Sequence, residues 1–120
     1  YKYNYRSYIK KTEELSYIQK LKISKDSVVF LCGDTHGSFH TTARNILRLF
    51  QSGIINNKWE ILHDNFYMIF TGDMVDYGYY GYENLMTILI LKCINPNKVF
   101  IIRGNHEEYA NNRKYYFNEI

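Results

Sequence analysis

Three short apolar runs recur along the chain, and each one ends abruptly in glycine or in polar residues. They occupy residues 28–32 (VVFLC), 67–71 (YMIFT) and 99–102 (VFII). A short, unbroken apolar run is typical of a strand buried in a parallel sheet. The pattern therefore predicts three parallel strands at these positions.

Two stretches between these runs, and one before them, have the spacing of apolar residues expected of helices. Residues 42–52 place four apolar residues at positions i, i+3, i+4 and i+7, and Gly53 is the expected stop. Residues 82–94 are apolar almost all round, which predicts a deeply buried helix. Residues 12–22 carry leucine or isoleucine at every third position, which predicts an N-terminal docking helix.

The order strand, helix, strand, helix, strand predicts an α/β fold with a parallel βαβαβ unit. We expect a single domain, with residues 1–27 as an N-terminal helical segment and residues 28–120 as the core. The chain opens on Tyr1 rather than Met and closes on Ile120 within a helical pattern. We therefore expect the domain to be incomplete.

Composition narrows the class of protein. Of the 120 residues, 46% are apolar and 18% aromatic, which is typical of a globular chain rather than a disordered one. The net charge is only +3, and Glu13 and Glu14 interrupt the basic N-terminal stretch, so we expect no nucleic-acid partner. Cys32 and Cys93 stand among apolar neighbours, and no apolar run reaches the ~18 residues of a membrane span. We expect an intracellular, cytoplasmic protein that does not bind membranes.

Each apolar run leads into glycine and into side chains with oxygen or imidazole donors. The junctions read GDTHG at 33–37, GDMVDYG at 72–78 and GNHE at 104–107. The carboxyl ends of parallel strands lie at one edge of a sheet, so these donors should converge. Four of them have the chemistry expected around two divalent cations: Asp34, His36, Asp73 and Asn105. Asp73, from the middle motif, is expected to bridge the two ions.

A second role is expected for His106 and Asp76. A histidine beside a metal cluster can protonate a departing alkoxide, because its pKa of about 6.5 permits donation near neutral pH. Asp76 would then orient the imidazole ring. The competing hypothesis makes His106 a metal ligand from the third strand, a role that Asn105 already fills in the first hypothesis.

The three motifs resemble the N-terminal signatures of the calcineurin-like metallophosphoesterases, and more narrowly those of the phosphoprotein phosphatase family of serine/threonine phosphatases. The narrower resemblance rests on Glu83 after the second motif, on Arg103 before the third, and on an Asn-Arg-x-Tyr-x-Phe pattern from Asn112 to Phe117. It covers about Val28 to Glu119, which corresponds to the N-terminal half of the family's catalytic domain.

The resemblance implies part of a four-layer α/β/β/α sandwich with two Mn, Fe or Zn ions at the strand ends. By resemblance, Asp34 and His36 would bind the first ion, Asp73 would bridge, and Asn105 would bind the second ion and the phosphate. A metal-bridging hydroxide would attack phosphorus, and His106 would act as the general acid. The implied substrate is a phosphorylated protein or a small phosphoester.

Two departures from the family bear on activity. Tyr77 stands where the family has a phosphate-clamping arginine, and a tyrosine donates one hydrogen bond without a charge. The family also takes two further metal-binding histidines and another arginine from later strands, beyond Ile120. We therefore expect the fragment alone to be inactive. The alternatives are a metallophosphoesterase acting on nucleotides or phosphodiesters, and a degenerate metal-binding relative without activity.

Overall fold

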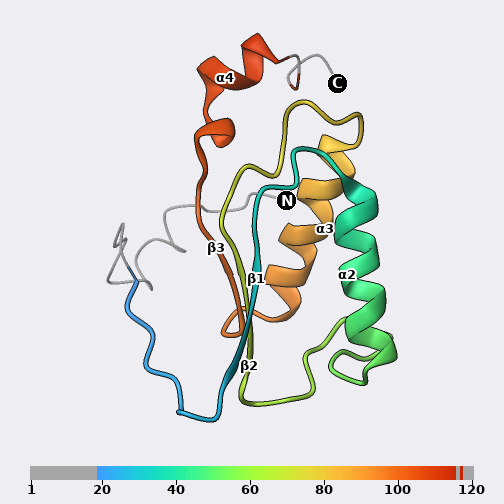
Figure 1. Ribbon diagram of the computed structural model, residues 1–120, viewed down its shortest axis with the longest axis vertical. Helices are drawn as coiled ribbons and strands as arrows, with labels where there is room; N and C mark the ends of the chain where they lie inside the picture. Colours follow the sequence, from blue (N-terminus) through green and yellow to red (C-terminus); the bar gives the residue numbers. More distant parts are fainter. Residues whose placement is uncertain (1–18, 116, 118–120) are drawn as a thin grey trace, which may run out of the picture.

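The computed structural model describes residues 19–115 and residue 117, and these form an α/β unit (Figure 1). The elements in chain order are β1 (Val28–Cys32), α2 (Phe39–Gln51), β2 (Phe66–Phe70), α3 (Gly81–Ile94), β3 (Val99–Ile101), the 3₁₀ helix η1 (Asn105–Glu107) and α4 (Tyr109–Lys114). All three predicted strands and both predicted inter-strand helices are present, with ends that differ by up to three residues. The predicted α/β class is confirmed.

The three strands form one parallel sheet in the order β1-β2-β3. Helices α2 and α3 lie side by side on one face of this sheet (Figure 1). Phe30, Met68 and Val99 are paired across the sheet in one row, and Met68 and Val99 are almost completely buried. Because strand side chains alternate between faces, this row belongs to the face that packs on the helices, where the core also takes Ile88 and Leu91 from α3.

The opposite face of the sheet is open in the described part of the chain. Leu31, Ile69 and Phe100 form the next row, and Leu31 is 66% exposed. The described residues therefore supply one helix layer and one sheet layer of the four layers that the resemblance implies. The expectation that every strand is buried holds for β2 but is wrong for β1, whose outer face has no cover from the described residues.

Two helix predictions need correction. Helix α3 is not deeply buried all round: its inner face is buried, but Met86, Leu89 and Ile90 are 38–44% exposed. Helix α3 carries more apolar residues than one face of the sheet can cover. Residues 12–18 of the predicted N-terminal helix lie outside the described residues. Its remaining residues, 19–22, are described and are not helical.

The predicted stop of the second helix is confirmed at Gly53, which has φ +70°. The Gly53 N–H donates to the Phe50 carbonyl and the Ile54 N–H donates to the Leu49 carbonyl, at 3.0 and 2.9 Å. These two bonds are the Schellman pattern, in which a left-handed residue without Cβ closes the last turn. No helix among the described residues is long and apolar enough to span a bilayer.

The two leucines of α3 make a matched test of this core. Leu91 is fully buried and Leu89 is 39% exposed, on the same helix. We expect Leu91→Ala to lower the free energy of unfolding by about 2–5 kcal/mol, because it leaves a cavity, and Leu89→Ala by less than about 1 kcal/mol. Urea denaturation followed by the fluorescence of Trp59, the single tryptophan, measures both. Equal losses for the two variants would contradict the assigned packing face.

Candidate metal centre

The loops after β1 and β2 are tied together through their backbones at one end of the sheet. The N–H groups of Thr35 and His36 both donate to the Asp73 carbonyl, at 3.1 and 2.9 Å, and the Gly37 N–H donates to the Met74 carbonyl at 2.9 Å. Because strand pairing alone does not extend this far, these bonds set the position of the first motif against the second. The expected convergence of the first two motifs is confirmed.

The third motif is held to the second by one carboxylate. Glu107 accepts hydrogen bonds from the N–H groups of Asp73, Met74 and Gly104, at 2.8, 2.7 and 2.8 Å. A carboxylate that accepts several backbone N–H groups forms charge-assisted bonds that are stronger than neutral ones. Glu107 therefore fixes the loop after β2 against the loop after β3.

Two glycines allow these loops to approach each other closely. Gly72 has φ +103°, and a Cβ there would collide with the backbone nitrogen of Gly104. A Cβ on Gly104 would in turn collide with the carboxylate of Asp73. Any other residue at either position would push Asp73 away from the third motif.

The backbone of the site is strained. Of the five non-glycine residues with positive φ in the described part of the chain, four lie here: His36 (+42°), Asp73 (+49°), Asp76 (+67°) and Tyr77 (+62°). Left-handed backbone costs a residue with Cβ about 1–2 kcal/mol, and such strain concentrates at functional sites. The hydrogen bonds just described hold His36 and Asp73 in that conformation.

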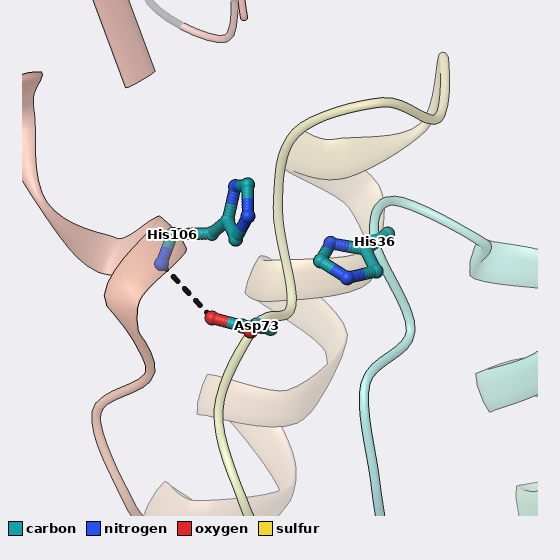
Figure 2. Close-up of side chains that lie close together, drawn as sticks. All are labelled: His36, Asp73 and His106. Atoms are coloured by element: carbon teal, nitrogen blue, oxygen red, sulfur yellow. Dashed lines mark hydrogen bonds between the residues drawn. The ribbon is translucent and has the colours of Figure 1, made fainter. Parts of the chain in front are cut away.

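Three possible ligand side chains meet where the three loops converge. His36, Asp73 and His106 each offer one donor atom, and these atoms all lie within 4.8 Å of one another. Figure 2 shows that each side chain comes from a different segment, after β1, β2 and β3. Two imidazoles and a carboxylate suit Zn, Fe or Mn. The donor set therefore fits a divalent metal ion.

The neighbouring bonds orient these donors. His36 Nδ1 lies 3.3 Å from the Val75 carbonyl oxygen, a contact typical of the second nitrogen of a metal-binding histidine. One Asp73 oxygen accepts from the His106 N–H at 2.9 Å (Figure 2). The side chain of Asp73 is therefore aimed by the third motif as well as by its own backbone.

The other two predicted ligands lie at the margin of this group. Asp34 has a side chain that is 61% exposed, with Oδ2 3.9 Å from His36 Nε2. Asn105 begins η1 and is exposed, and its carbonyl accepts from the Asn111 side chain at 2.6 Å. Asp34 therefore lies near His36 in space, and Asn105 directly precedes His106 in the sequence. The ligand roles of Asp34 and Asn105 stay predictions.

The expected contact between His106 and Asp76 is present. His106 Nδ1 lies 2.9 Å from Asp76 Oδ2, and both residues are buried. Asn112 donates to both Asp76 oxygens, at 3.3 and 3.2 Å, and also to the His106 carbonyl. Because a carboxylate accepts, the proton of a neutral His106 sits on Nδ1 and leaves Nε2 free as an acceptor.

Two residues of the site were given no role by the sequence analysis. Glu107 was only part of a motif, although a glutamate three residues after the N-cap position Gly104 can accept from its backbone N–H, which is one half of a capping box. Asn84 is fully buried in α3 and bonds to Thr42, to Thr35 at 2.8 Å and to the Met74 carbonyl at 2.7 Å. A single amide within an apolar helix was the available signal, since a buried polar group requires partners.

Tyr77 lies at the mouth of the site and is 61% exposed. Its ring centroid is 5.0 Å from that of His36, 5.1 Å from that of His106 and 4.7 Å from that of Tyr115. Hydrogen bonding with Tyr115 raises the pKa of Tyr77, and hydrogen bonding with Tyr77 and then Lys114 lowers the pKa of Tyr115. Tyr77 is therefore neutral at physiological pH.

The chain is similar to known phosphatases. The family model described as "Calcineurin-like phosphoesterase" matches residues 27–120. Serine/threonine-protein phosphatase T of Trypanosoma brucei brucei is 37% identical over 74% of this chain and 17% of its own length. The serine/threonine-protein phosphatase 6 catalytic subunit of Drosophila melanogaster is 39% identical over 66% of this chain and 22% of its own length.

A solved structure of a protein serine/threonine phosphatase from Saccharomyces cerevisiae aligns with a TM-score of 0.58 and 33% identity, over 77% of this chain and 26% of the yeast chain. This chain thus spans about a fifth of the curated relatives and about a quarter of the solved one. The region that the family model matches, residues 27–120, contains the three strands, the helices between them and all three motifs. The chain belongs to the calcineurin-like phosphoesterase family, among relatives of the serine/threonine phosphatases.

Proposed function

We propose that this chain contributes the metal-binding and proton-donating residues of a phosphomonoester hydrolase that acts on phosphoserine and phosphothreonine in proteins. The observation that carries the proposal is the cluster of His36, Asp73 and His106, with Asp76 bonded behind His106. The names of the relatives support the substrate class. Because the chain spans only part of those relatives, the activity of a whole enzyme is part of the proposal.

Four side chains would hold two divalent ions: Asp34 and His36 on the first, Asp73 between the two, and Asn105 on the second. When bound, such ions lower the pKa of water and neutralise charge on the phosphoryl oxygens. The chain's own contribution is to place the donors. Glu107 accepts from the Asp73 N–H, and the His106 N–H donates to the Asp73 carboxylate. These two bonds hold Asp73 in its strained backbone conformation before any ion binds.

His106 would carry the proton for the leaving oxygen on Nε2, because Nδ1 is committed to Asp76. Asp76 stabilises the imidazolium and fixes the plane of the ring, and Asn112 holds Asp76. A buried carboxylate paired with a buried imidazole is less screened by solvent than a surface pair. The same contact would make a ligand role for His106 possible only through Nε2.

Phosphate binding would fall to Asn105 and Tyr77. Asn105 offers the two N–H groups of its side-chain amide and Tyr77 offers one O–H group, all uncharged, where an arginine would offer a charged fork. We therefore propose weak ground-state binding of phosphate by this chain. The proton donor and the metal ligands would carry most of the catalytic effect.

Loss of a ligand should weaken metal binding. We expect His36→Asn and Asp73→Asn each to lower the affinity for Mn or Zn by at least about 10- to 100-fold, the scale seen even when a group behind a ligand is lost. His63→Asn is the matched control, since His63 is an exposed loop histidine. Isothermal titration of the purified chain gives these affinities. Wild-type metal affinity in both site variants would contradict the proposed metal centre.

The number of ions bound tests how complete the centre is. We expect the 120-residue chain to bind one ion more tightly than the second, with slow turnover of p-nitrophenyl phosphate, because few imidazoles are available to the second ion. Titration with Mn, followed by a steady-state assay, measures both. Two tight sites with sustained turnover would show that other residues of this chain, such as His40, complete the site.

His106→Asn separates its two possible roles. In a full-length enzyme that contains this chain, His106 as a general acid contributes roughly 10²–10⁴-fold to kcat for alkyl phosphoesters, so the variant should lose that factor and keep its metal content. The assay compares the rate per bound metal in the Mn-loaded protein, with metal content measured by emission spectroscopy. If the variant loses metal and the rate per bound metal is unchanged, His106 is a ligand.

Glu107→Gln tests the carboxylate that joins the motifs. The amide keeps one acceptor oxygen but turns an NH₂ group toward backbone N–H groups, so we expect a loss of about 1–3 kcal/mol in unfolding free energy together with weaker metal binding. Glu108→Gln is the control, because the Glu108 side chain is exposed and its ion pair with Arg103, at 3.8 Å, contributes little to stability. Urea denaturation of both variants measures the difference. Equal stability would mean that Glu107 does not hold the loops.

A further inference from the structure

One buried amide in α3 joins the two loops that carry the first and second motifs. Asn84 lies in the first turn of α3, at the end of the sheet where these loops meet (Figure 1). Its side chain is completely buried. The amide NH₂ donates to the Thr35 hydroxyl at 2.8 Å and to the Met74 carbonyl at 2.7 Å. A single side chain therefore bonds to both loops at once.

Both contacts of this amide lie one residue away from proposed metal ligands. Thr35 stands between Asp34 and His36, and Met74 directly follows Asp73. Because the peptide unit is planar and fixes the spacing of consecutive Cα atoms, a shift of Thr35 or Met74 also moves the adjoining ligands. The amide is thus in a position to set the spacing between the ligands of the first and second motifs.

The orientation of the amide is fixed by its partners. A carbonyl can only accept, so the NH₂ group of Asn84 must face Met74 and the amide oxygen must point the other way. That oxygen accepts from the hydroxyl of Thr42, which is itself buried on α2. Asn84 therefore links α3, α2 and both loops in one arrangement.

Packing alone does not explain a polar cluster at this place in the core. Replacing both partners of a buried hydrogen bond by apolar groups of the same shape is nearly neutral or stabilising. Asn84, Thr42 and Thr35 are instead polar, and the bonds among them are all made. A fully satisfied network of this kind specifies one arrangement of the segments that it joins. Its value therefore lies in the position of the loops.

We propose that Asn84 is a positioning residue of the metal centre, whose amide sets the spacing between the first and second motifs before an ion binds. The ligands that depend on this spacing are Asp34, His36 and Asp73. The inference rests on the proposed function, since the metal centre is part of it. Asn84 itself touches no metal ligand side chain and acts through residues next to the ligands. A site that is already ordered loses less entropy on binding, so loss of the amide should weaken metal binding.

Asn95 provides a matched control on the same helix. It caps the other end of α3, away from the three motifs (Figure 1), and is also buried. Its amide donates to the carbonyls of Trp59 and Leu91 and accepts from the Ile61 N–H. Asn84 and Asn95 thus share side-chain chemistry and burial, but Asn95 bonds to residues outside the metal-binding loops.

The test compares alanine variants of the two asparagines. We expect Asn84→Ala and Asn95→Ala to lower the urea midpoint by similar amounts, because each leaves buried polar groups without a partner. Only Asn84→Ala should weaken Mn binding, by about 10-fold or more, the lower end of the loss seen when a group behind a ligand is removed. Isothermal titration of the purified chain gives the affinities, at a temperature where the urea curves show each variant to be folded.

A cobalt spectrum supplies a second readout that general stability does not change. The visible absorption of protein-bound Co reports the geometry of its ligands. At saturating Co, Asn84→Ala should alter the visible bands relative to the wild-type chain, whereas Asn95→Ala should leave them unchanged. An identical spectrum and an unchanged Mn affinity in Asn84→Ala would overturn the inference.

Thr35→Val and Thr35→Ser form a milder pair that decides the question if Asn84→Ala does not fold. Valine keeps the shape of threonine but removes the hydroxyl that accepts from Asn84, whereas serine keeps the hydroxyl. We expect Thr35→Val to weaken Mn binding by about 3- to 10-fold, the factor that one hydrogen bond contributes, and Thr35→Ser to stay within about twofold of wild type. Equal affinities in the two variants would overturn the inference.

The outcomes separate this inference from the proposed function. If the wild-type chain binds neither Mn nor Co, the metal centre is overturned and the inference with it. If the wild-type chain binds an ion and Asn84→Ala binds it as tightly, the metal centre stands and Asn84 only fills the core. Equal losses of affinity in Asn84→Ala and Asn95→Ala would also overturn the inference, because a general loss of stability would then explain both.

Discussion

The contact on which the site depends is the carboxylate of Glu107 against three backbone N–H groups. Parallel pairing of β2 with β3 ends at Phe70 and Ile101, so the sheet itself does not position the loops beyond these residues. Glu107 supplies that connection by accepting from Asp73, Met74 and Gly104. Buried N–H groups that lose a partner cost about 1–3 kcal/mol each. The loops therefore have one well-defined arrangement, and the strained backbone of Asp73 is retained within it.

Much of the fold could be predicted from the sequence because its signals are local. Apolar runs of four or five residues marked the strands, and Gly53 marked a helix end through its left-handed backbone. What could not be predicted depends on contacts between distant segments. Leu89 and Ile90 are exposed because the described residues cover only one side of α3. The spacing of apolar residues along the chain does not indicate how many layers pack around a helix. Residues 19–22, the described end of the predicted N-terminal helix, are exposed and not helical, and the spacing of apolar residues does not by itself stabilise a helix.

The candidate site was also predicted only in part. Three parallel strands end at one edge of the sheet, and from this the sequence predicted that His36 and Asp73 lie together with His106 beside them. The residues that hold this arrangement were not recognised. Two of the three partners of Glu107 are backbone N–H groups more than thirty residues away in sequence. The partners of Asn84 lie on three different segments. A ligand is predictable from its own chemistry. A residue that positions a ligand is predictable only from the packing around it.

The pair of His106 and Asp76 shows how the site is assembled from two sources. Asp76 follows β2, whereas Asn112, which donates to both Asp76 oxygens, belongs to the short helix α4 beyond the sheet. A six-residue helix has little stability of its own, so its place is set by contacts such as those of Asn112 with Asp76 and His106. His36 and Asp73, the proposed metal ligands, are held by contacts between the loops after the strands, while His106, the proposed proton donor, also contacts Asn112 of α4. The ring of Tyr115, at the end of that helix, lies 4.7 Å from the ring of Tyr77. The orientation of His106 and the surroundings of Tyr77 are therefore both coupled to the docking of α4.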